Sequence, residues 1–150
     1  DKLKEKLVLL DEQLVFWDAL HDHCFQYLSA IMSCTERNSS IGSVMGIGNS
    51  CLMGDIKGSL DRSYYQMLQT LYKPLQSTLV KCNKVLIRIQ SICKEAEMIV
   101  HTQNISYQDP IVSHYMYLFD IIQNGYFREF ARLKEIIKSI PTLSNETERE

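Results

Sequence analysis

Apolar residues recur in the first part of the chain at alternating steps of four and three positions. A period of 3.5 residues over about four heptads predicts a long α-helix that packs along a partner helix. Additional apolar side chains widen this stripe, which favours a bundle of several helices over a two-stranded coil. The stripe consists of Leu3, Leu7, Leu10, Leu14, Trp17, His21, Cys24, Leu28 and Ile31, and the residues that widen it are Leu9, Phe16, Leu20 and Tyr27.

A second stripe with the same steps begins after Asp61, which we expect to cap the start of its helix. Proline inside a helix removes a hydrogen bond and costs about 3 kcal/mol, so Pro74 would usually end it. Because the stripe keeps its register at Pro74, we predict one kinked helix, with two abutting helices as the alternative. The stripe consists of Tyr64, Leu68, Leu71, Leu75, Thr78, Cys82, Val85, Ile89, Ile92, Ala96 and Ile99.

Between the two stripes, residues 35–59 show no helical period and contain five of the six glycines. Glycine lowers helix stability and is common in turns, so we predict a long Gly-rich loop or linker here. Loops of this length are usually functional or disordered. The apolar residues of the segment suit a role in docking a partner or covering the core, and disorder is the alternative. We also expect the charged tail, residues 142–150, to be disordered.

The last part of the chain predicts two short helices. Asp109-Pro110 is typical of a helix cap followed by proline at the first helical position. Asn124-Gly125 is a typical helix stop, and a further apolar pattern runs from Tyr126 to Ile140. Two short helices joined this closely are expected to form an antiparallel hairpin.

These patterns together predict an all-α protein. No stretch alternates polar and apolar residues between hairpin turns, as strands would. The length of 150 residues and the apolar content of 45% suit one domain with a sizeable core. We therefore expect a single domain over residues 1–150, built as an elongated bundle of two long antiparallel heptad helices plus a C-terminal helical hairpin.

Charge and hydropathy narrow the range of partners. A net charge of −2 offers no broad positive field for nucleic acid or anionic lipid. Apolar runs are only a few residues long, whereas a membrane-spanning helix needs about 20. We therefore expect no nucleic-acid binding and no membrane insertion. The opening "DKLKEKL" and the closing "SNETERE" suggest a piece of a longer or processed protein.

Five cysteines without a CxxC pair leave at least one unpaired, which favours a reducing compartment. We expect a cytoplasmic protein, with the nucleus as a second location. Three glycosylation sequons, which we place in loop or tail segments, support secretion as the minority alternative. They begin at Asn38, Asn104 and Asn145.

The stretch "FWDALHDHC" holds the densest group of potential metal ligands or catalytic residues. His21 and His23 lie about 200° apart around a helix, so they cannot bind one metal ion together. No second cluster completes a site with Asp18 and Cys24. We expect His21 to be a core-edge residue with a water or backbone partner. A histidine that sets helix register or senses pH is the alternative.

Other chemistry has weaker support. Cys82 and Cys93 lie in or beside an apolar stripe, where a thiol acts as a small hydrophobe, and Cys51 is the one thiol we expect to be exposed. "GSVMGIGNS" lacks the Lys-Ser/Thr end of a phosphate loop. We predict no enzyme activity, no cofactor and no metal.

Partner-binding candidates come from residues off the apolar stripes. Tyrosine is enriched at interfaces because it combines a large apolar ring with a polar tip. Dispersed cations usually form a solvated face, although they also suit an acidic partner. The candidates are Tyr65, Tyr72, Tyr117, Lys81, Lys84 and Arg88.

The leading functional hypothesis is a non-enzymatic interaction domain, an adaptor or scaffold within a larger intracellular protein. It would bind another helical protein, or a second copy of itself, through apolar and tyrosine-rich stripes. The alternative is a secreted, glycosylated ligand of the cytokine type, with two long and two short helices.

Overall fold

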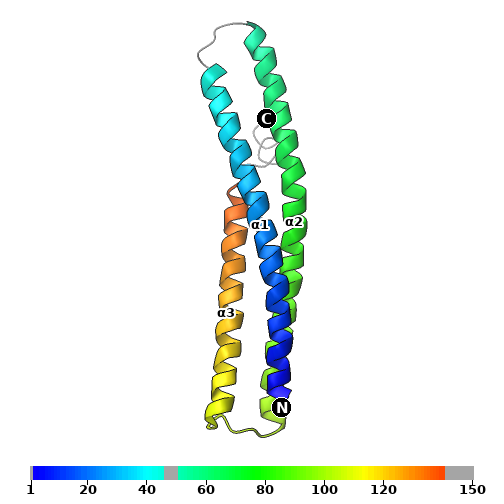
Figure 1. Cartoon of the computed structure of the whole chain (residues 1–150), viewed down its shortest axis with the longest axis vertical. Helices are drawn as coiled ribbons and strands as arrows, with labels where there is room; N and C mark the ends of the chain where they lie inside the picture. Colours follow the sequence, from blue (N-terminus) through cyan, green and yellow to red (C-terminus); the bar gives the residue numbers. More distant parts are fainter. Residues whose placement is uncertain (1, 46–50, 141–150) are drawn as a thin grey trace. The chain divides into compact units, whose positions relative to one another are not determined.

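The computed structural model describes residues 2–45 and 51–140, and three α-helices account for most of them (Figure 1). Helix α1 spans Lys2–Met45, α2 spans Cys51–Thr102 and α3 spans Pro110–Lys138. The described residues contain no strand. The prediction of an all-α protein is therefore confirmed. The expected tail over residues 142–150 lies outside the described residues.

The chain divides into two compact units. Unit 1 consists of Asp1–His21 and Leu79–Ile137, and unit 2 consists of Asp22–Thr78 and Lys138–Glu150. Every position of the two predicted apolar stripes is buried or half-buried. The expectation of a single domain stays a prediction.

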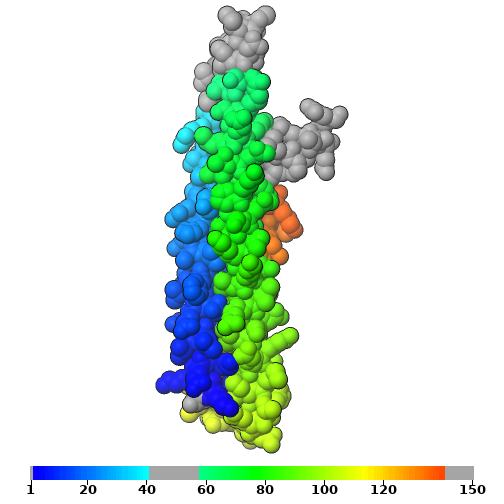
Figure 2. All heavy atoms as spheres, turned by 90° about the vertical axis from the view of Figure 1, so that its right-hand side faces the viewer, coloured from blue at the N-terminus to red at the C-terminus, as the bar shows by residue number. Residues whose placement is uncertain are grey.

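In unit 1, segments of all three helices pack on one another, and α2 runs opposite to α1 and α3 (Figures 1 and 2). Trp17 on α1 contacts the rings of Tyr126 and Phe130 on α3. The Cys93 thiol on α2 lies 3.8 Å from the backbone oxygen of Phe119 on α3. The most deeply buried side chains of this core are Leu3, Leu10, Trp17, Cys82, Leu86, Ile89, Ala96, Val100, Phe119 and Leu133.

In unit 2, α1 packs against the first half of α2. The thiol of Cys34 lies 3.4 Å from the thioether sulfur of Met67, and the hydroxyl groups of Thr35 and Tyr64 are 3.3 Å apart. Among the side chains of this unit that the structure describes, the buried ones are Cys24, Leu28, Ile31, Cys34, Leu68, Leu75 and Thr78.

The turn between α2 and α3 satisfies the free backbone groups at both helix ends. Asn104 adopts a positive φ of 49°, and the N–H groups of Asn104 and Ile105 donate to the carbonyls of His101 and Val100. This is a Schellman motif with asparagine in place of glycine. Asp109 Oδ1 accepts a hydrogen bond of 2.9 Å from the N–H of Ile111. The predicted cap at Asp109-Pro110 is therefore confirmed.

The predicted C-terminal hairpin is wrong, because α3 is one continuous helix through Asn124 and Gly125. No described glycine has a positive φ. A glycine inside a helix costs about 1 kcal/mol relative to alanine. In α3 that cost is offset because the buried positions, from Val112 to Ile137, lie on both sides of Gly125 along one helix. The four helices expected for the secreted alternative are consequently reduced to three in the described residues.

The predicted loop over residues 35–59 is wrong for most of its length. Helix α1 continues to Met45 and α2 already begins at Cys51, so Asp61 lies inside a helix and does not cap one. Extending a formed helix adds a hydrogen bond per residue without the cost of a new nucleus, so scattered glycines need not end it. Residues 46–50 lie outside the described residues.

Helix α2 passes through Pro74 without a break, which confirms the prediction of one helix over two abutting ones. The neighbouring positions Leu68, Leu75 and Thr78 are buried. The Thr78 hydroxyl donates a hydrogen bond of 2.8 Å to the carbonyl of Pro74, which satisfies this buried polar group. Packing on both sides of the proline offsets the hydrogen bond that it removes.

Candidate interaction surface

Three cations share one exposed face of α2 in unit 1, which we call the cationic face. Lys81, Lys84 and Arg88 are spaced i, i+3 and i+7, a spacing that places side chains on one side of a helix. All three are exposed. The pKa of Glu95 is lowered mainly by the hydrogen bond that it accepts from Lys6, and Arg88 adds a smaller effect. The cationic face is therefore open to solvent.

The three candidate tyrosines lie in different surroundings. Tyr117 on α3 of unit 1 is exposed, and Ile121 follows it one turn later as a second exposed apolar side chain. Tyr65 and Tyr72 on α2 of unit 2 are half-buried, and the Tyr65 ring lies 5.1 Å from that of Tyr64. Of the three, Tyr117 presents the largest contact area to a partner.

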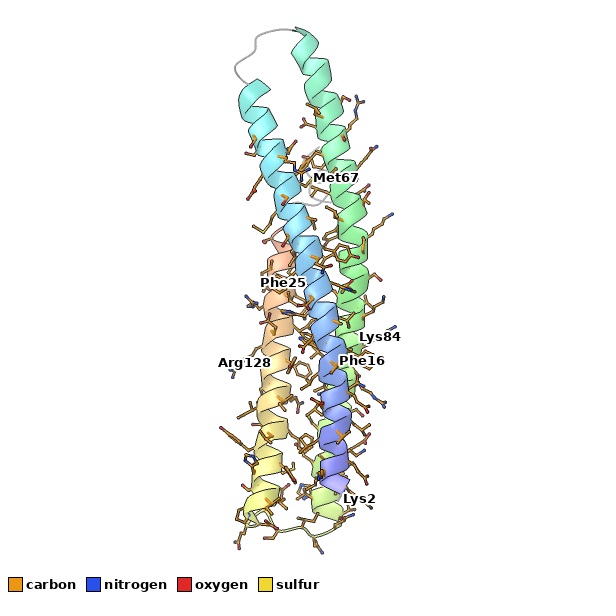
Figure 3. All side chains as sticks on the ribbon, viewed as in Figure 1. Lys2, Phe16, Phe25, Met67, Lys84 and Arg128 are labelled. Atoms are coloured by element: carbon orange, nitrogen blue, oxygen red, sulfur yellow. The ribbon has the colours of Figure 1, made fainter. Side chains whose placement is uncertain are left out.

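Exposed apolar side chains on α1 were not expected from the sequence. We predicted that Leu9 and Phe16 widen the buried stripe, but both are exposed, Phe16 to 60% (Figure 3). Leu20, by contrast, is half-buried as part of the wider stripe. Phe16 lies about 100° around the helix from Trp17, which already fills the core side at this level. Val8 and Val15 are seven positions apart, with the acidic residues Asp11 and Glu12 between them, and this spacing is the sequence signal that could have revealed the second face.

His21 lies at the edge of the core of unit 1. Its Nε2 is 2.8 Å from Oε1 of Glu129 on α3, and Glu129 also accepts two hydrogen bonds from Arg132. The side chains of His21 and Glu129 are 25% and 28% exposed. A carboxylate is thus one partner of His21, which we had not expected from the sequence. A role in helix register or pH sensing stays a prediction.

Replacing Glu129 by glutamine should make the free energy of unfolding less dependent on pH in the acidic range. Arg132, and to a smaller extent His21, hold the pKa of Glu129 below its ordinary value of 4.5. Wild-type stability from this group is present above that value and is lost as the pH falls through the lowered pKa. At pH 7, we expect the free energy of unfolding of E129Q to be lower than that of wild type by about 1 kcal/mol or less. Between pH 5 and 3, the free energy of unfolding should fall less in E129Q than in wild type. Urea unfolding at several pH values measures this. Equal pH profiles would contradict it, and E12Q, at an exposed acid, is the control.

Four cysteines of the described part, Cys24, Cys34, Cys82 and Cys93, are buried thiols. Burial, together with the negative charges of Glu97 and Asp120, raises the pKa of Cys93 to about 11. A thiol with this pKa is a poor nucleophile at neutral pH. Cys82 and Cys93 are both buried in the core, which agrees with the prediction that they are packing residues. The Cys51 side chain lies outside what the structure describes.

The rate of alkylation should distinguish these buried cysteines from any accessible thiol. With a pKa of about 11, Cys93 is thiolate at pH 8 in only about one molecule in 1,000. We expect the four buried cysteines to react with iodoacetamide at least about 100-fold more slowly in the folded protein than in urea. Peptide mass spectrometry over a time course measures each site. Modification of Cys93 at equal rates in both conditions would contradict the burial.

A small pocket lies between α1 and α2 in unit 2. Its volume is about 140 Å³, and it is lined by Cys34, Arg37, Asn38, Leu60, Ser63, Tyr64 and Met67. The pocket has room for only a few atoms of a ligand. Arg37 is its single charged lining residue.

Two of the three predicted sequons lie in the described part of the chain. Asn38 lies inside α1 and not in a loop, which corrects our assignment, whereas Asn104 lies in the turn after α2. The described residues contain no group of three or more His, Cys, Asp or Glu side chains that could hold a metal ion. No helix in this part of the chain has the length and apolar character needed to cross a bilayer. Asn145 lies outside the described residues.

Comparisons of the chain with protein-family models, with curated proteins and with solved structures found no match.

Proposed function

We propose that this chain is a non-enzymatic protein–protein interaction domain, with an adaptor or scaffold role, that binds helical partners. Apolar and tyrosine-bearing faces of its helices supply the contact area. Within each unit, α1 and α2 would pack along their heptad stripes and so hold the outer faces rigid.

The observation that carries the proposal is the number of large apolar side chains left on outer helix faces. In unit 1 they recur at seven-residue spacing on both long helices, as Val8 and Val15 on α1 and Val80 and Ile87 on α2. Single exposed apolar residues are ordinary, whereas aligned ones concentrate apolar area along one side of a helix. When another helix covers such a surface, the free energy falls because apolar area is removed from water.

The cationic face and Tyr117 would add specificity to this contact. Lys81, Lys84 and Arg88 attract an acidic helix and disfavour a basic one. Tyr117 and Ile121 form an apolar pair on α3 that a partner helix could cover. Tyr65 and Tyr72 contribute only their exposed edges.

A cytoplasmic location accompanies the proposal. The buried thiols support it, because a reducing compartment keeps cysteines in the form in which they pack as small apolar side chains. Expression in a secretory host offers the contrasting test: glycans on Asn38 or Asn104 together with disulfides would favour the secreted alternative.

Affinity purification with surface variants tests the proposed function. The bait would be the purified chain, compared with Y117A/I121A on α3 and with K81E/K84E/R88E on α2. Gln90→Ala, at an exposed polar position on α2, is the control. We expect at least one surface variant to reduce recovery of specific proteins fivefold or more in quantitative mass spectrometry. Equal recovery by all four baits, each with wild-type circular dichroism, would contradict the proposal.

A further inference from the structure

Unit 1 exposes two short rows of residues, each with one charged residue between two apolar ones. The charge is negative in one row and positive in the other. The acidic row on α1 consists of Val8, Asp11 and Val15, and the basic row on α2 consists of Val80, Lys84 and Ile87. All six residues are exposed, and the four apolar ones are between 55% and 65% accessible. Each row therefore has a central charge between two branched apolar side chains.

Both rows point away from the core of unit 1. Val15 lies about 200° around α1 from the buried Trp17, and Val80 lies about 200° around α2 from the buried Cys82. The two helices already use their inner sides to pack within one molecule. The acidic and basic rows of one copy therefore cannot meet each other.

The spacing of the two rows matches in one direction only. The acidic row advances by three and then four positions, from Val8 to Asp11 to Val15. The basic row has the same steps when it is followed backwards, from Ile87 to Lys84 to Val80. An antiparallel pair consequently places Val8 opposite Ile87, Asp11 opposite Lys84 and Val15 opposite Val80. A parallel pair would also align the two apolar levels, but it would offset Asp11 from Lys84 by one residue, about 1.5 Å along the axis. Only the antiparallel pair aligns the charged level as well.

We propose that the acidic row of one copy of this chain binds the basic row of a second copy, with the two helices antiparallel. Two apolar levels are covered by this contact, and an Asp–Lys pair between them sets register and orientation. The inference deepens the proposed function by naming one partner, and it rests on the exposed helix faces described there.

The two rows are different surfaces, so the contact is heterologous. A pair of copies leaves one acidic and one basic row uncovered, and further copies add to form a chain or a ring. Three levels of one helix pair bury little area, so association is weak, with a dissociation constant of roughly 10 to 1,000 µM.

Charge reversal in sedimentation equilibrium tests the contact. The wild-type average mass should rise with concentration between about 10 µM and 1 mM. In D11K, two lysines face each other across the contact, and in K84D two aspartates do, so each variant alone should stay monomeric. An equimolar mixture of D11K and K84D restores opposite charges at every contact and should associate like wild type. Arg128→Asp, an exposed cation on α3, is the matched control and should associate normally (Figure 3).

Disulfide trapping tests the antiparallel register. In a Cys51→Ser background, copies carrying Asp11→Cys are mixed with copies carrying Lys84→Cys, and the mixed disulfide is measured after mild oxidation. Met98→Cys lies on the same exposed face of α2, about 21 Å further along the helix, and serves as the off-register control. We expect trapping at position 84 to exceed trapping at position 98 at least fivefold.

Three results would overturn the inference: wild-type protein that is monomeric at 1 mM, a mixture of D11K and K84D that stays monomeric, or an Arg128→Asp variant as impaired as K84D. Circular dichroism of each variant excludes misfolding as the cause. If self-association fails while the affinity purification still finds surface-dependent partners, this inference is wrong and the proposed function stands.

Discussion

Replacing Trp17 by alanine is expected to lower the free energy of unfolding by about 3–5 kcal/mol. Trp17 is 2% exposed, and its ring meets those of Tyr126 and Phe130 edge-on at centroid distances of 5.6 and 6.1 Å. Truncation removes the apolar area of the indole and leaves a cavity between α1 and α3. Urea unfolding followed by circular dichroism at 222 nm measures the loss, since W17A has no tryptophan fluorescence.

The neighbouring residue is the matched control for this prediction. Phe16 is 60% exposed, so F16A is expected to change the free energy of unfolding by about 0.5 kcal/mol or less. The two variants alter adjacent aromatic residues on the same helix and differ chiefly in burial. A loss of similar size in both would show that the core side of α1 is not where the structure places it.

Proline in place of Gly125 is expected to destabilise the protein by about 3 kcal/mol or more. The substitution removes the backbone N–H of residue 125 from the middle of α3 and brings the proline ring against the carbonyl of Ile121. Alanine at the same position should act in the opposite direction. It should stabilise by up to about 1 kcal/mol, because a Cβ there meets no atom within 4 Å and alanine favours the helix.

The sign of the Gly125→Ala effect separates the observed helix from the hairpin that its sequence suggested. A helix stop at Gly125 would need a positive φ, and alanine would then be strained and destabilising by about 1 kcal/mol. Thermal and urea unfolding of G125A and G125P decide between the two. Lower stability of G125A would contradict the continuous α3.

Local sequence features predicted several elements correctly. The all-α class follows from hydrophobic periodicity, and α2 passes through Pro74 because the buried positions keep their register on both sides of it. The cap at Asp109 and the start of α3 at Pro110 follow from a side-chain hydrogen bond and a fixed φ, both of which act within a few residues. Interactions of such short range can be inferred without knowing the rest of the fold.

Helix ends without such a signal were predicted poorly. Residues 35–45 and 51–59 are helical although this region is rich in glycine and lacks a regular apolar pattern. Asn124-Gly125 has the composition of a helix stop and lies inside α3. In α3, a propensity difference of about 1 kcal/mol at Gly125 is small beside the burial of apolar residues on both sides of it. The outcome depends on packing partners that are distant in sequence.

The candidate interaction surface shows the same limit. Lys81, Lys84 and Arg88 could be assigned to one exposed face from spacing alone. Periodicity could not show that Phe16 is exposed while Trp17 is buried, because both lie on the broad apolar side of α1. Nor could it show that His21 meets Glu129, since these residues are 108 positions apart.

The order of residues alone was sufficient for the helical class, the apolar stripes and the cap of α3, because periodicity and capping depend on neighbours within one or two turns. Only the packed structure decided where α1 and α2 end and that α3 is continuous. It also decided which apolar residues beside each stripe are exposed to solvent. Those outcomes depend on which helix covers which face, and that choice is made by the burial of residues far apart in the chain.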